Sequence, residues 1–296
     1  MTAISSFIDQ GWNDHVDDLP GVTARLNDGF ALLEDSPADL NGLLQLAEHV
    51  HIVHRGDPQA MQLVIERAAA LLARQGDAQT TVNKARVSMA LLRDEPVDAS
   101  TLPLPALIRA HGSAVCGLAA RDEVAKARRL LQATASLARD ADAAVRTDAT
   151  KALAATYNNL ASLLLDIPRS AQAGQLMLDA AAHARSTWAE VGTWLNVERA
   201  DYMLSICHAA MGHGARAAEH AQSCLAVCEA NAADAFERFF AHEAMARALL
   251  ADHNKQAALL ESQQMQDLLA QIADEGNRAY ASVVLSKLQK QESQHP

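Results

Sequence analysis

The sequence predicts an all-α protein made of antiparallel helical hairpins. Glycine (13) and proline (8) are scarce among the 296 residues and aromatic residues make up 4%, a composition that favours long, closely packed helices. No window alternates at period two for long enough to predict a sheet. A pattern of two amphipathic helices joined by a short turn recurs at 156–180, 201–224 and 242–265. Because one hairpin hides only part of its apolar surface, the recurrence predicts that the hairpins stack on one another.

The clearest hairpin is 156–180, whose two helices are expected to meet at 166–168. Small residues recur where its helices must approach each other closely. When the hairpins are aligned on the alanines of their second helices, Ala173, Ala217 and Ala258 fall about 44 and about 41 residues apart, a spacing in the range of helical repeats.

The chain before residue 94 is expected to form short helices separated by polar turns. Gly56 and Gly76 are typical stops at helix C-termini. The segment 94–105 then carries three prolines, which remove backbone donors and disfavour helix at the preceding positions. We therefore place a domain boundary there, with an N-terminal helical segment at 1–98 and a repeat region at 99–296. The helices expected before the boundary are 3–12, 20–36, 37–56, 58–76 and 80–93.

The repeat region is expected to be nearly continuous helix. Its last helix ends in a polar tail that suits a cap on the stack. The expected helices are 105–120, 122–140, 142–166, 168–190, 193–211, 214–231, 233–252, 254–274 and 277–291.

Composition argues against several classes of function. A formal net charge of −11 and a pI near 5.5 disfavour binding to nucleic acid and to anionic membranes, because both need clustered basic residues. The first residues lack a secretory leader, and no stretch of about 18 uncharged apolar residues occurs, so we expect a cytoplasmic protein. The four cysteines are then expected to be reduced thiols.

The repeat resembles the tetratricopeptide repeat (TPR) in its longer form of roughly 40 residues, over about residues 105–275. A weaker unit fits 108–134, and 20–75 fits a degenerate unit. The alternatives for the N-terminal helices as a whole are an atypical cap or a second small helical subdomain. The resemblance implies a right-handed solenoid that binds extended peptides or partner helices in a concave groove lined by the first helix of each pair. The residues that carry it are Tyr157, Leu160, Ala161, Leu164, Ala173, Met177 and Ala180; Leu204, Ser205, His208, Gly212, Ala217, Ala221 and Cys224; and Met245, Ala246, Leu249, Ala258, Ser262 and Met265.

The resemblance also implies which residues line the groove. Asparagine amides can donate to and accept from a peptide backbone, and arginines can hold a carboxylate in a bidentate fork. Asn159 aligns with Met203 and Ala244 in the next two units, so a repeated clamp for a terminal carboxylate is not expected. The alternative for the asparagines is that they fill a helix interface or face water. The groove residues are Arg109 in the weaker unit, then Asn158, Asn159 and Ser162, then Arg199 and Tyr202, then Glu243 and Arg247.

Two histidine-containing patterns invite a metal hypothesis. His220, Cys224 and Cys228 are spaced by four and could offer zinc one face of donors, but buried cysteine also packs as a small apolar side chain, which we favour. Glu48 and His51 match one Glu-x-x-His element of a di-iron bundle, and no second element occurs.

No phosphate-binding loop, nucleophile elbow or Ser/His/Asp arrangement is found, so we predict no catalytic residue, no metal and no cofactor. The favoured function is a non-catalytic scaffold or adaptor for a protein or peptide, with homo-oligomerisation left open. One alternative is a regulatory domain that responds to a small ligand or signalling peptide through Arg199, Tyr202 and Arg247. A less favoured alternative is a metal-dependent helical enzyme that uses Glu48, His49, His51 and His54.

We expect the double substitution Asn158→Ala with Arg199→Ala to leave the chain folded and to abolish capture of a partner from cell lysate, because both residues are predicted to line the groove. Unchanged capture by the folded variant would remove them from the site.

Overall fold

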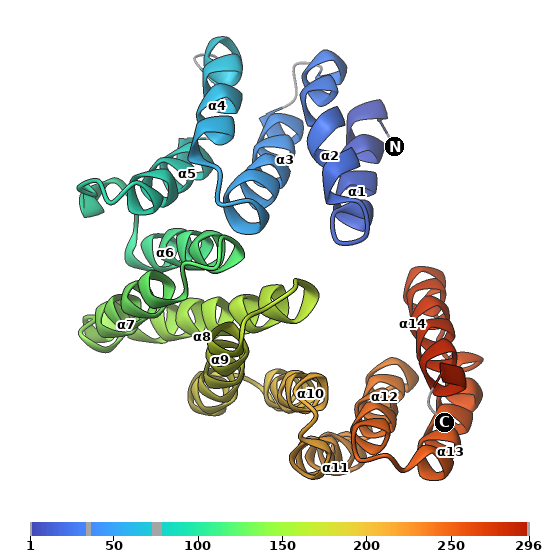
Figure 1. Ribbon diagram of the computed structural model, residues 1–296. Helices are drawn as coiled ribbons and strands as arrows, with labels where there is room; N and C mark the ends of the chain where they lie inside the picture. The colour runs from blue at the N-terminus through green and yellow to red at the C-terminus, as the bar shows by residue number, and fades with distance from the viewer. Residues whose placement is uncertain (1, 34–36, 73–78, 295–296) are drawn as a thin grey trace. The chain divides into compact units, whose positions relative to one another are not determined.

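The computed structural model describes residues 2–33, 37–72 and 79–294, and these ranges contain helices and no strand, as Figure 1 shows. The predicted all-α class is confirmed. None of the helices in these ranges combines the length and the apolar character needed to cross a bilayer. The α-helices are α1 (Ala3–Asp14), α2 (Leu19–Arg25), α3 (Pro37–Glu48), α4 (Pro58–Leu72), α5 (Gln79–Leu92), α6 (Leu104–Ala120), α7 (Val124–Arg139), α8 (Ala143–Asp166), α9 (Ala171–Val191), α10 (Trp194–Ala210), α11 (Gly214–Ala230), α12 (Ala235–Ala251), α13 (Lys255–Leu269) and α14 (Glu275–Gln294).

The helices form two compact units, unit 1 at 1–173 and unit 2 at 174–296. Within unit 1, α5 packs against α6, so helices from both sides of residue 98 share one core. The domain boundary expected there stays a prediction, although the connection itself is present. Between α5 and α6 the described chain has one short 3-10 helix, η4 (Ala99–Thr101).

Helix α6 is the centre of unit 1. It contacts α5, α7, α8 and the segment that follows α3, and most of its residues from Leu107 to Ala119 are buried. Ser88 of α5 donates from Oγ to the carbonyl of Ala110 at 2.9 Å, which satisfies a buried hydroxyl on this interface. Leu102 of the connection packs into the same core. The proline-rich connection is therefore anchored by apolar contacts.

Two expected helices change geometry at their C-terminal ends. The helix expected at 20–36 is α-helical only to Arg25 and continues as a 3-10 helix, η1 (Leu26–Leu32). The helix expected at 37–56 becomes a π-helix, η2 (His49–His54), directly after α3. Ser36 and Gly76, the stops expected for two helices, lie outside the described residues.

The π-helix lies where two backbones meet. A Cβ atom on Gly117 of α6 would lie 2.4 Å from the carbonyl oxygen of Ile52, and one on Gly56 would lie 2.5 Å from the carbonyl oxygen of Gly117. Gly56 also has a positive φ of 56°, so it ends the helix as expected from the sequence. Two glycines thus allow η2 and α6 to approach more closely than any other residue would permit.

Unit 2 contains successive helices that pack in pairs. Each of α10 to α13 packs against the next helix along the chain, and Figure 1 shows the short connections between them. A left-handed backbone conformation occurs in three of these connections, at Gly212, Ala232 and His253. Asp234 and Asn254 then cap α12 and α13 by accepting hydrogen bonds from backbone N–H groups.

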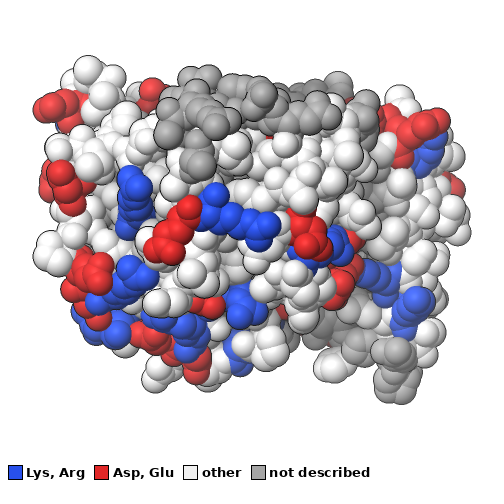
Figure 2. Space-filling model, turned by 90° about the horizontal axis from the view of Figure 1, so that it is seen from above, with Lys and Arg blue, Asp and Glu red and all other residues white. Residues whose placement is uncertain are grey.

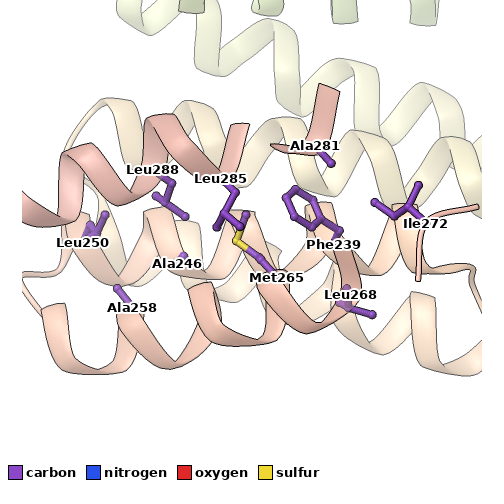
Figure 3. Packing of buried hydrophobic residues seen from close by; sticks show 10 residues of the cluster. All are labelled: Phe239, Ala246, Leu250, Ala258, Met265, Leu268, Ile272, Ala281, Leu285 and Leu288. Carbon is purple, nitrogen blue, oxygen red and sulfur yellow. The ribbon is translucent and has the colours of Figure 1, made fainter. Parts of the chain in front are cut away.

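The core of the last hairpins is drawn in Figure 3, where side chains of α12, α13 and α14 gather between the helices. Phe239 is its largest member and is fully buried against Met265 and Leu285, among others. The small residues predicted for close approach, Ala217 and Ala258, are fully buried as well. Large side chains therefore fill the core while alanines set the spacing of the helices.

We expect Gly117→Ala to destabilise the protein by about 1–3 kcal/mol, because the new methyl group must displace the carbonyl of Ile52. The free energy of unfolding in urea measures this effect. Gly42→Ala in α3 is the matched control: its Cβ would meet only the flexible end of Ile8, at 3.2 Å, and Ala favours helix over Gly. Equal effects of the two substitutions would contradict the close approach of η2 and α6.

Candidate functional site

The predicted groove residues are divided between the two units. Those of unit 1 lie on α6 and α8, two helices that pack against each other, and those of unit 2 lie on α10 and α12. Arg109 and Asn159 are exposed, and Asn158 and Ser162 are half-buried. The exposure of Asn159 fits either a groove or the alternative of a residue that faces water.

Glu243 of α12 joins three helices of unit 2. It is 2% exposed and accepts two hydrogen bonds, from Tyr202 Oη at 2.8 Å and from Arg247 Nε at 2.7 Å. Arg247 also donates to Gln291 of α14 at 3.0 Å. The structure thus brings three of the predicted residues, Tyr202, Glu243 and Arg247, into one network. Burial and the Glu243 carboxylate raise the pKa of Tyr202 well above its ordinary value, so its hydroxyl stays protonated and donates.

Arg199 makes the bidentate fork that the sequence predicted for a ligand, but its partner is Glu237 of α12. Nε donates to Oε2 at 3.2 Å and Nη2 donates to Oε1. The Arg199 side chain remains 57% exposed, whereas that of Glu237 is largely buried. Arg199→Ala would leave this carboxylate without its cation, so the double substitution that includes it carries a cost in stability that the sequence does not reveal.

Two aromatic residues that the sequence analysis missed lie beside this network. Phe240 contacts Tyr202 edge-to-face, with ring centroids 5.8 Å apart, and stacks on Tyr280 of α14, also at 5.8 Å. We call Tyr202, Phe240 and Tyr280 the aromatic band. Tyr280 is 60% exposed. Phe240 could have been found because it precedes Glu243 by three residues on one helix face, whereas Tyr280 lies beyond the end of the recognised repeat at about residue 275.

Glu198 of α10 is a buried carboxyl group with one unsatisfied oxygen. It is 1% exposed, and its Oε2 has no hydrogen-bond partner. Burial, reinforced by the nearby charge of Glu237, raises the pKa of Glu198 to about 8. Asp201, one turn further on, is equally buried but accepts from Arg185 Nε at 3.1 Å and lies 3.1 Å from His220 Nδ1. Glu198 therefore keeps its proton to a higher pH than an ordinary glutamate does.

The two cysteines of the zinc hypothesis lie in the core of unit 2. Cys224 donates from Sγ to the backbone carbonyl of Glu198 at 3.4 Å, and Cys228 Sγ lies 3.9 Å from Glu198 Oε1. Burial raises the pKa of Cys228 to about 12, and the ring of His220 is held by Asp201. This is the arrangement of packed, protonated thiols that the sequence analysis favoured.

Three histidines of unit 1 form a separate cluster that differs from the one considered in the sequence. His15, the C-cap of α1, meets His49 and His54 at the two ends of η2. One ring nitrogen from each lies within 4.8 Å of the other two. His49 Nε2 and His54 Nε2 are 3.1 Å apart. Burial, with a smaller contribution from neighbouring histidines, lowers the pKa of His49 to about 3 and that of His54 to about 4.

Glu48 and His51, the other members of the hypothetical metal site, point elsewhere. Glu48 Oε2 pairs with Lys84 Nζ at 3.0 Å, and His51 is buried with no hydrogen-bond partner for Nδ1. The sequence analysis assumed an α-helix, in which residues three apart share a face. The π-helix brings residues five apart together instead, so His49 and His54 lie close to each other.

Charged side chains of both signs are interspersed on the face shown in Figure 2. This mixed distribution accompanies the net charge of −11. Phosphate-binding surfaces gather Lys and Arg instead, so this face has no resemblance to one.

Comparison of the chain with protein-family models and with curated protein sequences gave no match.

We expect the unfolding free energy to fall between about pH 5 and pH 8 because of Glu198. Its pKa is higher in the folded chain than in the unfolded chain, so between these two values the folded state holds an extra proton, and raising the pH favours unfolding by at most about 1.4 kcal/mol per pH unit. Below the pKa of the unfolded chain this contribution is fully present. Urea unfolding at several pH values should show that Glu198→Gln removes this slope.

Glu229→Gln, at an exposed position on α11, is the control for the same change of side chain and should leave the slope in place. A slope that persists unchanged in Glu198→Gln would show that other groups cause it.

Proposed function

We propose that the chain is a TPR-like solenoid that binds a protein or peptide without chemistry of its own. Support comes from how the helix pairs contact each other. In unit 1 the first helices α6 and α8 pack together, and in unit 2 α10 packs on α12 and α12 on α14. First helices of neighbouring pairs also lie side by side in helical-repeat proteins, where they form one continuous binding face.

The aromatic band is the observation that carries the proposal. Its three rings come from the first helices α10, α12 and α14, so it runs along the direction in which the helix pairs follow one another. Tyr280 is 60% exposed although its ring stacks on Phe240. Aromatic side chains offer a large, rigid contact area and dominate the binding energy of many interfaces. An exposed aromatic ring supported by half-buried neighbours is therefore a good anchor for a ligand side chain.

The charged residues beside the band favour an apolar anchor over a ligand carboxylate. Arg199 is neutralised by Glu237, and Arg247 is neutralised by Glu243. To bind a carboxylate, either arginine would have to abandon a largely buried partner, which is costly. We infer that the partner is an amphipathic peptide or helix that places apolar side chains on the band. Basic or mixed flanking charges suit the net charge of −11.

The polar residues of unit 1 fit a second role. Arg109 on α6 and Asn158, Asn159 and Ser162 on α8 offer amide, hydroxyl and guanidinium groups on the first helices of their pairs. Such groups can bind the backbone of an extended peptide. We propose that they form a polar binding surface of unit 1, in a protein that acts in the cytoplasm.

The band is tested by selecting linear peptides from a random displayed library with the full chain as target. We expect selected peptides to carry aromatic or aliphatic anchors and to bind Tyr280→Ala at least about tenfold more weakly, because the exposed anchor is lost. Leu260→Ala is the matched control: Leu260 is 68% exposed, but it lies on the second helix α13. Fluorescence anisotropy with one labelled peptide gives the affinities.

Equal binding by folded Tyr280→Ala and the original chain would contradict a role for the band, as would an equal loss in Leu260→Ala. Because removal of one stacked ring costs only about 0.5–1.5 kcal/mol, Tyr280→Ala should remain folded, which circular dichroism can verify.

A further inference from the structure

The histidine cluster of unit 1 has the geometry of a metal site. The ring centroids of His15, His49 and His54 are separated by 4.7 to 5.1 Å, so the rings form a nearly equilateral triangle. Each pair of rings is inclined by 73° or 74°. The side chains therefore converge on a common centre without stacking, as three ligands around one ion do.

The spacing of the His49 and His54 nitrogens fits the first coordination shell of zinc, and His15 would have to move closer to them. His49 Nε2 and His54 Nε2 are 3.1 Å apart. Two imidazole nitrogens at the usual Zn–N distance of about 2.0–2.1 Å would lie roughly 2.8–3.4 Å apart at coordination angles between octahedral and tetrahedral. An ion could thus be bound by both nitrogens with only small movements of the rings.

His15 is oriented for the same purpose. Its Nδ1 donates to the carbonyl of Trp12 at 2.6 Å, and a carbonyl can only accept. The proton is therefore fixed on Nδ1, which leaves the lone pair of Nε2 available as a ligand. Histidine ligands of metal sites commonly donate their second nitrogen to a backbone carbonyl in this way. Trp12 also packs against His15 and His49, with centroids 5.7 and 4.8 Å away, and so holds both rings in place.

The π-helix is what places two ligands on one face. In an α-helix, residues five apart point about 140° away from each other. In a π-helix the hydrogen bonds run between residues five apart, so His49 and His54 lie one above the other. Such π segments occur frequently at functional sites. Lys84, the cation nearest to His49, is paired with Glu48 at 3.0 Å, which offsets its repulsion of a metal ion.

We propose that His15, His49 and His54 bind one divalent transition-metal ion, with zinc as the representative ion, in unit 1. Three imidazoles leave at least one coordination position for water or for a donor atom of another molecule, as in zinc sites with three protein ligands. The site links the C-terminal end of α1 to η2, so bound metal also stabilises the fold of unit 1. It is independent of the peptide-binding face proposed for unit 2.

The test uses the untagged full chain after removal of metal with a chelator. Calorimetric titration with zinc chloride should show one equivalent bound per chain. Titration with cobalt chloride should give the visible absorption of cobalt in a low-symmetry nitrogen site. His15→Gln and His54→Gln should each weaken zinc binding by more than the roughly 10- to 100-fold that loss of an outer-shell partner costs. Zinc should raise the melting temperature of the original chain and leave both variants nearly unchanged.

His213→Gln is the control, because His213 belongs to a second group of neighbouring histidines, with His208 and His220, in unit 2. It should bind zinc like the original chain. Circular dichroism of the metal-free variants verifies their fold. If His54→Gln does not fold, His15→Gln decides the matter, since His15 lies at the half-exposed end of α1. Failure of the folded original chain to bind one equivalent would overturn the proposal, as would binding that survives in His15→Gln or is lost in His213→Gln.

Discussion

Close approach of helix backbones through small side chains is the constraint on which both units depend. In unit 1 the carbonyl of Ile52 lies where a side chain of residue 117 would begin, so only glycine fits between η2 and α6. In unit 2, fully buried alanines such as Ala217 and Ala258 occupy the corresponding places between helices. Phe239 is buried in one cluster with three such alanines, Ala246, Ala258 and Ala281. The low glycine content of the chain makes the few glycines at backbone contacts correspondingly important.

Much of the secondary structure could be predicted because it is local. Amphipathic periodicity, caps and glycine stops reside within a few residues of each helix end, and the helices from α6 onward begin and end close to where the sequence predicted. The periodicity of the sequence did not predict the π-helix, which packs closely against α6 at Gly117, more than 60 residues away in the sequence. Tertiary contacts of this kind are invisible to a search for periodicity, so the histidines were grouped by the rules of an α-helix.

The candidate binding face, like the secondary structure, could be predicted from the sequence only in part. Aligning the repeats identified Tyr202, Glu243 and Arg247, which the structure brings into one hydrogen-bonded network. The alignment did not reveal that Arg199 already forms an ion pair with Glu237, a residue 38 positions away in the sequence. A comparison of Glu243 with Glu198 shows how different the surroundings of two buried carboxyl groups can be. Both carboxyl groups are buried, but Glu243 accepts from a guanidinium and a phenol, while Glu198 Oε2 has no hydrogen-bond partner and burial raises the pKa of Glu198 to about 8.

The π-helix has a consequence for how much change in length this chain can tolerate. A π segment is equivalent to an α-helix that contains one additional residue, so its geometry depends on the number of residues between Glu48 and Arg55 as well as on their identity. Deleting one residue between His49 and His54 would leave an ordinary α-helix in which the two histidines are four residues apart and share one face. The chain after the deletion would keep its direction relative to α3, because the deleted residue is the additional one that the π-helix accommodates. In this segment, loss of one residue is therefore less damaging than in an ordinary helix, where it turns the following chain by about 100°.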